Sequence, residues 1–240
     1  MKVTERTAVG DIVAKYPKAA RVFEAHRIDY CCGGDHPLTE ACDAAGASPA
    51  AVLNEILQAV AKPVADRDWT ADTLADLIQH IVDVHHAYLR EELPVLTNRL
   101  QKVLAAHGER HGASLSALSA AFDELHRDLG PHLEKEERIL FPAILRCEQA
   151  AGEPGGARAA GAAGLRHPIA VMQQEHESAG RALKQMRTVA EDYTVPADGC
   201  TTYRALFDGL VRLEADLHRH IHLENNILFP RVIALGAALG

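Results

Sequence analysis

Apolar residues recur every three or four positions through most of the chain, which is the spacing of an amphipathic helix. Leu74, Leu77 and Ile78 begin one such stripe, and no segment shows the regular alternation expected of a half-buried strand. Past residue 70 the spacing predicts four long helices, over about residues 72–106, 114–150, 168–192 and 201–235. We therefore expect an all-α protein in which residues 70–240 form an up-down four-helix bundle.

A smaller helical domain is predicted ahead of the bundle, over residues 1–62. Its short apolar patterns are interrupted by Cys31-Cys32-Gly33-Gly34, which we expect to form a turn because paired glycines break both regular structures. Residues 63–69 contain a proline and several charges, and we interpret them as the linker between the two domains. Residues 152–164 are rich in Gly and Ala and are predicted to form a flexible connection within the bundle.

Charge and composition narrow the class of partner. The 240 residues carry a formal net charge of −8 with no block of Lys or Arg, which argues against nucleic acid or an anionic membrane surface as partner. No apolar run approaches the roughly 20 residues needed to cross a bilayer. The polar residues 1–11 do not resemble a secretory signal. The five cysteines are an odd number, so we expect reduced thiols in a cytoplasmic protein.

Two of the 14 histidines belong to an internal repeat. The stretches that begin at His132 and His220 share His, Glu, Ile, Leu, Phe and Pro at one offset of 88 residues. Each contains His-x-x-x-Glu, ending at Glu136 and Glu224. Four residues along a helix rise roughly 6 Å and rotate about 40° out of register, so both side chains of a pair point the same way. Two such pairs on facing helices can bind a pair of metal ions.

The other two long helices are expected to supply one histidine each. His86 and His176 lie within the apolar periodicity and are 90 residues apart, although His85 remains an alternative to His86. With the repeated pairs they make four imidazoles and two carboxylates, which suit two iron ions; manganese or zinc is also compatible with these ligand types. Other metal and thiol motifs are missing from the sequence, namely Glu-x-x-His, His-Glu-x-x-His and Cys-x-x-Cys.

These motifs resemble a known family. His-x-x-x-Glu on two helices, with single histidines on the others, resembles hemerythrin-like domains. Asp29-Tyr30-Cys31-Cys32-Gly33-Gly34 is similar to the N-terminal signature of the iron–sulfur cluster repair di-iron proteins, the RIC or YtfE/ScdA family, and the Ile-Leu-Phe-Pro ends of the repeat also match. The resemblance implies a hemerythrin-like bundle with two iron ions, an oxo or hydroxo bridge and two bridging glutamates. The implied iron ligands are His86, His132, Glu136, His176, His220 and Glu224.

The resemblance also implies a function, which is repair of iron–sulfur clusters damaged by nitrosative or oxidative stress. Iron donation to damaged iron–sulfur proteins is the favoured route. The alternative is binding, scavenging or reduction of nitric oxide at the di-iron centre, so whether the protein is an enzyme stays open. Gly180 stands one turn after His176, where oxygen carriers have a second histidine, which argues against reversible oxygen carriage.

The N-terminal domain carries two further expectations. By the same resemblance, Cys31 and Cys32 are expected to relay iron or to react as thiols. A homodimer through this domain is compatible with the sequence.

Overall fold

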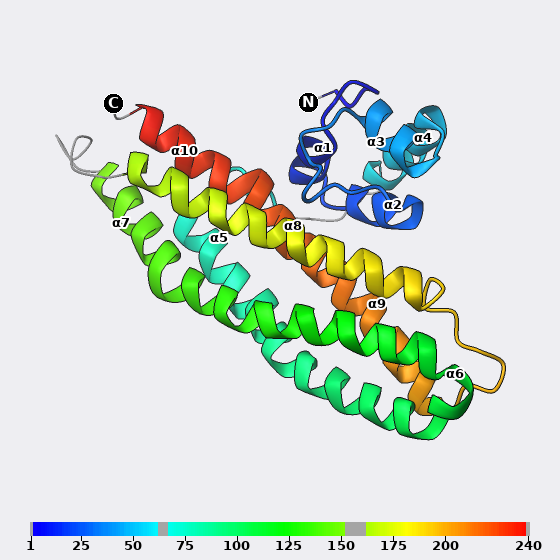
Figure 1. Cartoon of the computed structure of the whole chain (residues 1–240). Coiled ribbons are helices and arrows are strands. Elements are labelled where there is room, and N and C mark those ends of the chain that lie inside the picture. The colour runs from blue at the N-terminus through cyan, green and yellow to red at the C-terminus, as the bar shows by residue number, and fades with distance from the viewer. Residues whose placement is uncertain (1, 62–66, 152–161, 239–240) are drawn as a thin grey trace. The chain divides into compact units, whose positions relative to one another are not determined.

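Helices make up almost all regular structure in the computed structural model, which describes residues 2–61, 67–151 and 162–238 (Figure 1). Among these residues the only β-type pairing is an isolated bridge between Ala8 and Pro37, so the all-α prediction is confirmed. The predicted linker at 63–69 and connection at 152–164 fall mostly outside the described residues. No described helix combines the length and the apolar character that a membrane span requires.

The chain divides into two compact units. The first comprises residues 1–79, 143–169 and 218–240, and the second comprises residues 80–142 and 170–217. The helical segments that lie wholly or mostly in the first unit are α1 (Val9–Lys15), α2 (Ala19–His26), α3 (Leu38–Ala45), α4 (Pro49–Val60), α5 (Leu74–His80), α7 (Phe141–Ala151), the 3-10 turn η4 (Ala162–Leu165), the π-helical η5 (Leu223–Leu228) and α10 (Phe229–Ala238). The predicted division at residues 63–69 stays a prediction.

The N-terminal helices α1 to α4 enclose an apolar core of their own. Tyr30 stacks on Phe23 with ring centroids 5.9 Å apart, and both side chains are almost fully buried. Burying a large apolar side chain contributes roughly 1.5–3 kcal/mol to stability. Other fully buried members of this core are Val9, Ile12, Ala19, Leu38, Cys42, Val52 and Ile56. This core fixes the positions from which the chain enters and leaves the turn at Cys31 and Cys32.

An asparagine from η5 packs against that turn within the same unit. The Nδ2 atom of Asn226 donates hydrogen bonds to the carbonyl oxygens of Tyr30 and Cys31, at 3.1 Å each. Gly10 and Gly34 leave the space for this side chain: a Cβ on Gly34 would overlap the Asn226 amide, and one on Gly10 would lie 2.7 Å from its Oδ1. Glycine is therefore required at both positions by close approach.

The second unit is an up-down bundle of four helical limbs. It contains the π-helical η1 (Ile81–His86) and η2 (Glu136–Leu140), α6 (Ala87–Lys135), and most of α8 (Arg166–Val189) and α9 (Thr201–His222). The sequence predicts a break over 107–113, but α6 is helical there except at His111, where φ is −117° and ψ is 18°. The helix α6 is kinked there, and Figure 1 shows that it turns back on itself and supplies two limbs. The core between the limbs includes Leu96, Leu100, Phe122, Leu183, Leu206, Leu210 and Leu213.

Three π-helical segments interrupt the long helices, and each carries a predicted metal ligand. His86 is the last residue of η1, Glu136 is the first of η2, and Glu224 lies in η5. A π-turn adds one residue to the helical repeat, so it rotates the following side chains relative to the preceding ones. The sequence pattern predicts uninterrupted α-helices here, because a single extra residue does not disturb an apolar stripe enough to be recognised.

Gly34→Ala should destabilise the protein, because the new methyl group would displace the Asn226 amide from its two carbonyl partners. We expect a loss of about 1–3 kcal/mol in the free energy of unfolding, typical of overpacking and a lost hydrogen bond. Gly108→Ala is the matched control: its Cβ would meet only Leu104, at 3.9 Å, within α6. The free energy of unfolding of that variant should rise by about 0.5–1 kcal/mol, because alanine loses less backbone freedom than glycine on folding. Urea unfolding measures both, and equal effects would contradict this account.

Candidate metal centre

The first repeated pair lies where α6 passes into η2. His132 and Glu136 are four residues apart, and His132 Nε2 lies 3.2 Å from Glu136 Oε1. The side chain of Glu136 is completely buried, and His132 is 4 % exposed. The predicted helical geometry thus places the imidazole and the carboxylate together in the interior.

Two further histidines of the second unit approach the same carboxylate. His86 Nε2 lies 3.4 Å from Glu136 Oε2, and His176 Nε2 lies 4.0 Å from Glu136 Oε1. The Nε2 atoms of His132 and His176 are 3.2 Å apart. Phe141, one of the residues that recur in the repeat, stacks on the His86 ring with centroids 5.8 Å apart. Three imidazoles therefore turn the same ring nitrogen toward one buried glutamate.

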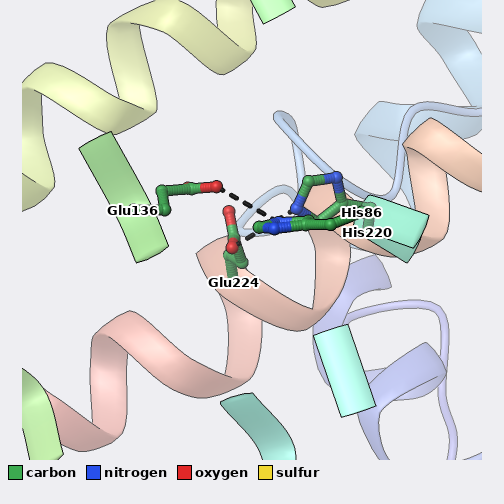
Figure 2. A group of neighbouring side chains, drawn as sticks. All are labelled: His86, Glu136, His220 and Glu224. Atoms are coloured by element: carbon green, nitrogen blue, oxygen red, sulfur yellow. Dashed lines mark ion pairs between the residues drawn. The ribbon is translucent and has the colours of Figure 1, made fainter. Parts of the chain in front are cut away.

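The second repeated pair lies where α9 passes into η5. His220 Nε2 is 3.4 Å from Glu224 Oε1, and both side chains are buried. Figure 2 shows this pair together with His86 and Glu136, with the carboxylates and rings pointing toward one another. The two repeats therefore have the same local geometry.

All six predicted ligands fall into two groups that could each hold a metal ion. One group is His86, Glu136, His220 and Glu224; the other is His132, Glu136, His176 and Glu224. Within each group, one ligand atom per residue lies within 4.8 Å of the others. Both glutamates belong to both groups, which is the arrangement that bridging carboxylates require. Of the adjacent histidines 85 and 86, only His86 belongs to either group.

The chemistry of this donor set fits divalent or trivalent cations. All six residues are at most 4 % exposed, and both glutamates are at 0 %. A buried carboxylate loses its hydration, and this costs several kcal/mol unless positive charge or hydrogen bonds compensate. Imidazole nitrogens and carboxylate oxygens together suit iron, manganese or zinc. The two shared glutamates would supply negative charge to both positions.

Two outer carboxylates hold ligand histidines by their other ring nitrogen. His86 Nδ1 lies 2.7 Å from Glu137 Oε1, and His132 Nδ1 lies 2.8 Å from Glu175 Oε2. Arg90 and Lys135 pair with these carboxylates at the bundle surface. A carboxylate at Nδ1 keeps the proton there, so that Nε2 carries the lone pair with which an imidazole binds a metal.

The pKa values of both outer carboxylates agree with that role. Burial alone would raise the pKa of Glu137, but hydrogen bonds from His86 and Arg90 outweigh it and lower the pKa below its usual value. For Glu175, the bonds from Lys135 and His132 likewise outweigh burial and lower the pKa. The sequence pattern indicates neither residue, because a carboxylate next to a ligand along a helix points to a different side.

Two other buried histidines lie within two residues of predicted ligands in the sequence. His85 is 5 % exposed, and its Nδ1 lies 2.9 Å from Asp216 Oδ1. His222 Nδ1 lies 3.1 Å from Asn226 Nδ2, and burial lowers the pKa of its imidazole to about 4. Both belong to the packed interior, and neither falls in the two metal groups.

Cys31 and Cys32 belong to neither of the two metal groups and form a separate group with Asp29. The hydrogen bond to Cys32, together with burial and the nearby carboxylate, raises the pKa of the Cys31 thiol well above its usual value. Cys31 is buried and Cys32 is half-buried. Their predicted part in iron or thiol relay remains a prediction.

The chain is similar in sequence to known protein families and to known proteins. The hemerythrin HHE cation binding domain matches residues 77–232, and ScdA_N, described as a domain of unknown function (DUF542), matches residues 5–60. The iron–sulfur cluster repair protein YtfE of Enterobacter sp. (strain 638) is 36 % identical over 226 residues, which cover 94 % of this chain and 96 % of that protein. The proteins of the same name from Cronobacter sakazakii and Musicola paradisiaca are 36 % and 37 % identical over the same shares.

Glu224→Gln should lower the metal content after reconstitution with ferrous iron from two ions per chain to one or none, because the glutamate belongs to both groups. The neutral amide should also leave the metal-free protein at least as stable as wild type, since it removes a buried charge. Glu134→Gln is the control, an identical change at a side chain that is 62 % exposed. Elemental analysis and thermal unfolding measure the two effects. Two ions retained by Glu224→Gln would contradict the assignment.

Glu175→Gln tests the outer carboxylates. Loss of the charged partner of His132 Nδ1 should weaken metal binding by about 10–100-fold, as for other outer partners of metal-binding histidines. Glu177→Gln, at an exposed position of the same helix, should leave the affinity unchanged. Competition with a metal chelator gives both affinities. Equal values for the two variants would rule out this role for Glu175.

Proposed function

The chain belongs to the YtfE family of iron–sulfur cluster repair proteins, and on this basis we propose that it binds two iron ions and donates iron to damaged iron–sulfur clusters. The partners would be iron–sulfur proteins damaged by nitrosative or oxidative stress, in the cytoplasm. The ligands would be His86, His132, Glu136, His176, His220 and Glu224, with an oxo or hydroxo bridge between the ions.

The observation that supports this proposal is the sharing of Glu136 and Glu224 by both groups of four residues. Two carboxylates and four neutral imidazoles bring a charge of −2 to two cations, so the positive charge is only partly neutralised. Each group contains two histidines, so each position would have a limited number of fixed protein ligands. A site of this kind can hold iron and still release it.

The residues around the proposed iron site orient its ligand side chains and exclude water from it. Glu137 and Glu175 fix the rings of His86 and His132, and Phe141 covers one face of the His86 ring. The cations Arg90 and Lys135 are half exposed and hold the outer carboxylates at the surface. Protonation or displacement of these outer carboxylates would loosen two ligands without unfolding the bundle. When bound, the iron would itself be the cargo for repair and would provide a redox-active metal.

Nitric oxide chemistry is the second candidate function. The same shared glutamates would hold two metal ions as neighbours, so that each could bind one nitric oxide molecule. Gly180 stands one turn after His176 and has no side chain that could bind a metal, so this position adds no ligand. Reduction of two nitric oxide molecules to nitrous oxide and water would take one electron from each of two ferrous ions and two protons from solvent, whereas iron donation alone yields no nitrous oxide.

Anaerobic incubation with a nitric-oxide-damaged cluster enzyme tests the proposal. The iron-loaded protein should restore the enzyme's activity beyond the level given by the same amount of free ferrous iron. Glu224→Gln should fail to do so, and the exposed control Glu134→Gln should match wild type. Recovery no greater than with free iron would contradict iron donation. Nitrous oxide formed from added nitric oxide in a parallel reaction would favour the second function.

A further inference from the structure

Asp29, Cys31 and Cys32 form a compact turn with three metal-binding atoms on one side. Asp29 Oδ1 accepts hydrogen bonds from the backbone N–H groups of Cys31, at 3.0 Å, and Cys32, at 2.9 Å. The Sγ atom of Cys31 lies 3.3 Å from the same oxygen and 3.9 Å from the Sγ atom of Cys32. One atom from each residue lies within 4.8 Å of the other two.

The distances in this turn fit a tetrahedral cation site. Two thiolates bound to one metal at about 2.3 Å, at the tetrahedral angle, would be roughly 3.8 Å apart, and a thiolate and a carboxylate oxygen roughly 3.5 Å. The observed separations are 3.9 Å between the sulfur atoms and 3.3 Å between sulfur and oxygen. A disulfide would require the sulfur atoms to lie about 2.05 Å apart. The turn therefore needs little adjustment to bind a cation.

The backbone of the turn is held by groups outside it. Asn226 Nδ2 donates to the carbonyls of Tyr30 and Cys31, and Asn225 Nδ2 donates to the Cys31 carbonyl at 3.4 Å. On the other side, Gly10 N–H donates to the Gly34 carbonyl at 2.8 Å. Fixed backbone and a carboxylate oriented by two amides are the support that metal ligands receive in proteins.

The internal repeat indicates that this support is specific to the second copy. Asn225 and Asn226 occupy the positions of Glu137 and Arg138 in the first copy. Glu137 orients His86, and Arg138 is 76 % exposed. The second copy keeps His-x-x-x-Glu but replaces this charged pair by two amides that hold the cysteine turn. The two copies therefore differ at the positions where the second one contacts the turn.

We propose that Asp29, Cys31 and Cys32 bind one divalent cation of thiophilic or borderline character, as a second metal site of the chain. Asp29 is exposed and Cys32 is half-buried, so solvent can reach the site and a water molecule can complete four ligands. Three protein ligands with an open position bind exchangeably. The identification of ferrous iron from the di-metal centre as the natural cargo rests on the proposed function; the site itself does not.

Titration of the reduced full-length protein with Co²⁺ tests this site without any activity measurement. Thiolate-bound Co²⁺ gives a near-ultraviolet charge-transfer band, which nitrogen and oxygen ligands do not give. We expect the final amplitude of this band in the wild type to correspond to one thiolate-bound Co²⁺ per chain, in addition to the ions taken up by the His and Glu groups. Cys31→Ser and Cys32→Ser should each abolish or strongly weaken it. Asp29→Asn, whose Oδ1 can still accept both amide hydrogen bonds, should bind about tenfold more weakly.

Two control variants separate this site from other effects. Cys200→Ser removes an exposed cysteine elsewhere and should leave the band unchanged. Glu224→Gln, which impairs the di-metal centre, should also retain it, so failure of the iron-donation proposal would not affect this result. Absence of the band in the wild type would overturn the proposal, as would a band that survives both Cys31→Ser and Cys32→Ser. Circular dichroism checks that each variant is folded.

Discussion

Burial of two carboxylates among four imidazoles is the constraint on which the rest of this structure depends. Glu136 and Glu224 are fully buried, and at that depth an ionised glutamate is tolerated only where positive charge or hydrogen bonds replace its hydration. Each glutamate belongs to both candidate metal groups. The bundle therefore has to bring four helical limbs to one place and keep water out, and its apolar core serves that purpose.

Departures from regular α-helix set the positions of the ligand side chains within the site. Three π-helical segments coincide with His86, Glu136 and Glu224. An extra residue per turn weakens local hydrogen bonding and is usually retained where a functional side chain gains from the changed direction. Outer carboxylates then fix the rings, and surface cations fix the outer carboxylates. Stability and ligand geometry are thus provided by different layers of the same bundle.

The two copies of the repeat share ligands but differ in the residues directly after each glutamate. In the first copy, Glu137 turns back to orient His86. In the second, Asn225 and Asn226 support the turn that carries Cys31 and Cys32. Hydrogen-bonding amides suit backbone carbonyls, as carboxylates suit protonated imidazole nitrogens. Both motifs carry metal-binding residues, but the first also orients a ligand histidine and the second also supports the thiol turn.

The sequence by itself determined the helical class and the repeated His-x-x-x-Glu, and it predicted that these two pairs converge with one histidine from each of the other two limbs. Those features depend on local periodicity, because the fixed rise and rotation of a helix decide which side chains point the same way. It left His85 and His86 as alternatives, and it did not reveal Glu137, Glu175 or Asn226 as partners. Only the tertiary structure decided these, because π-turns change the register by one residue and contacts between segments 43 to 195 residues apart leave no local pattern.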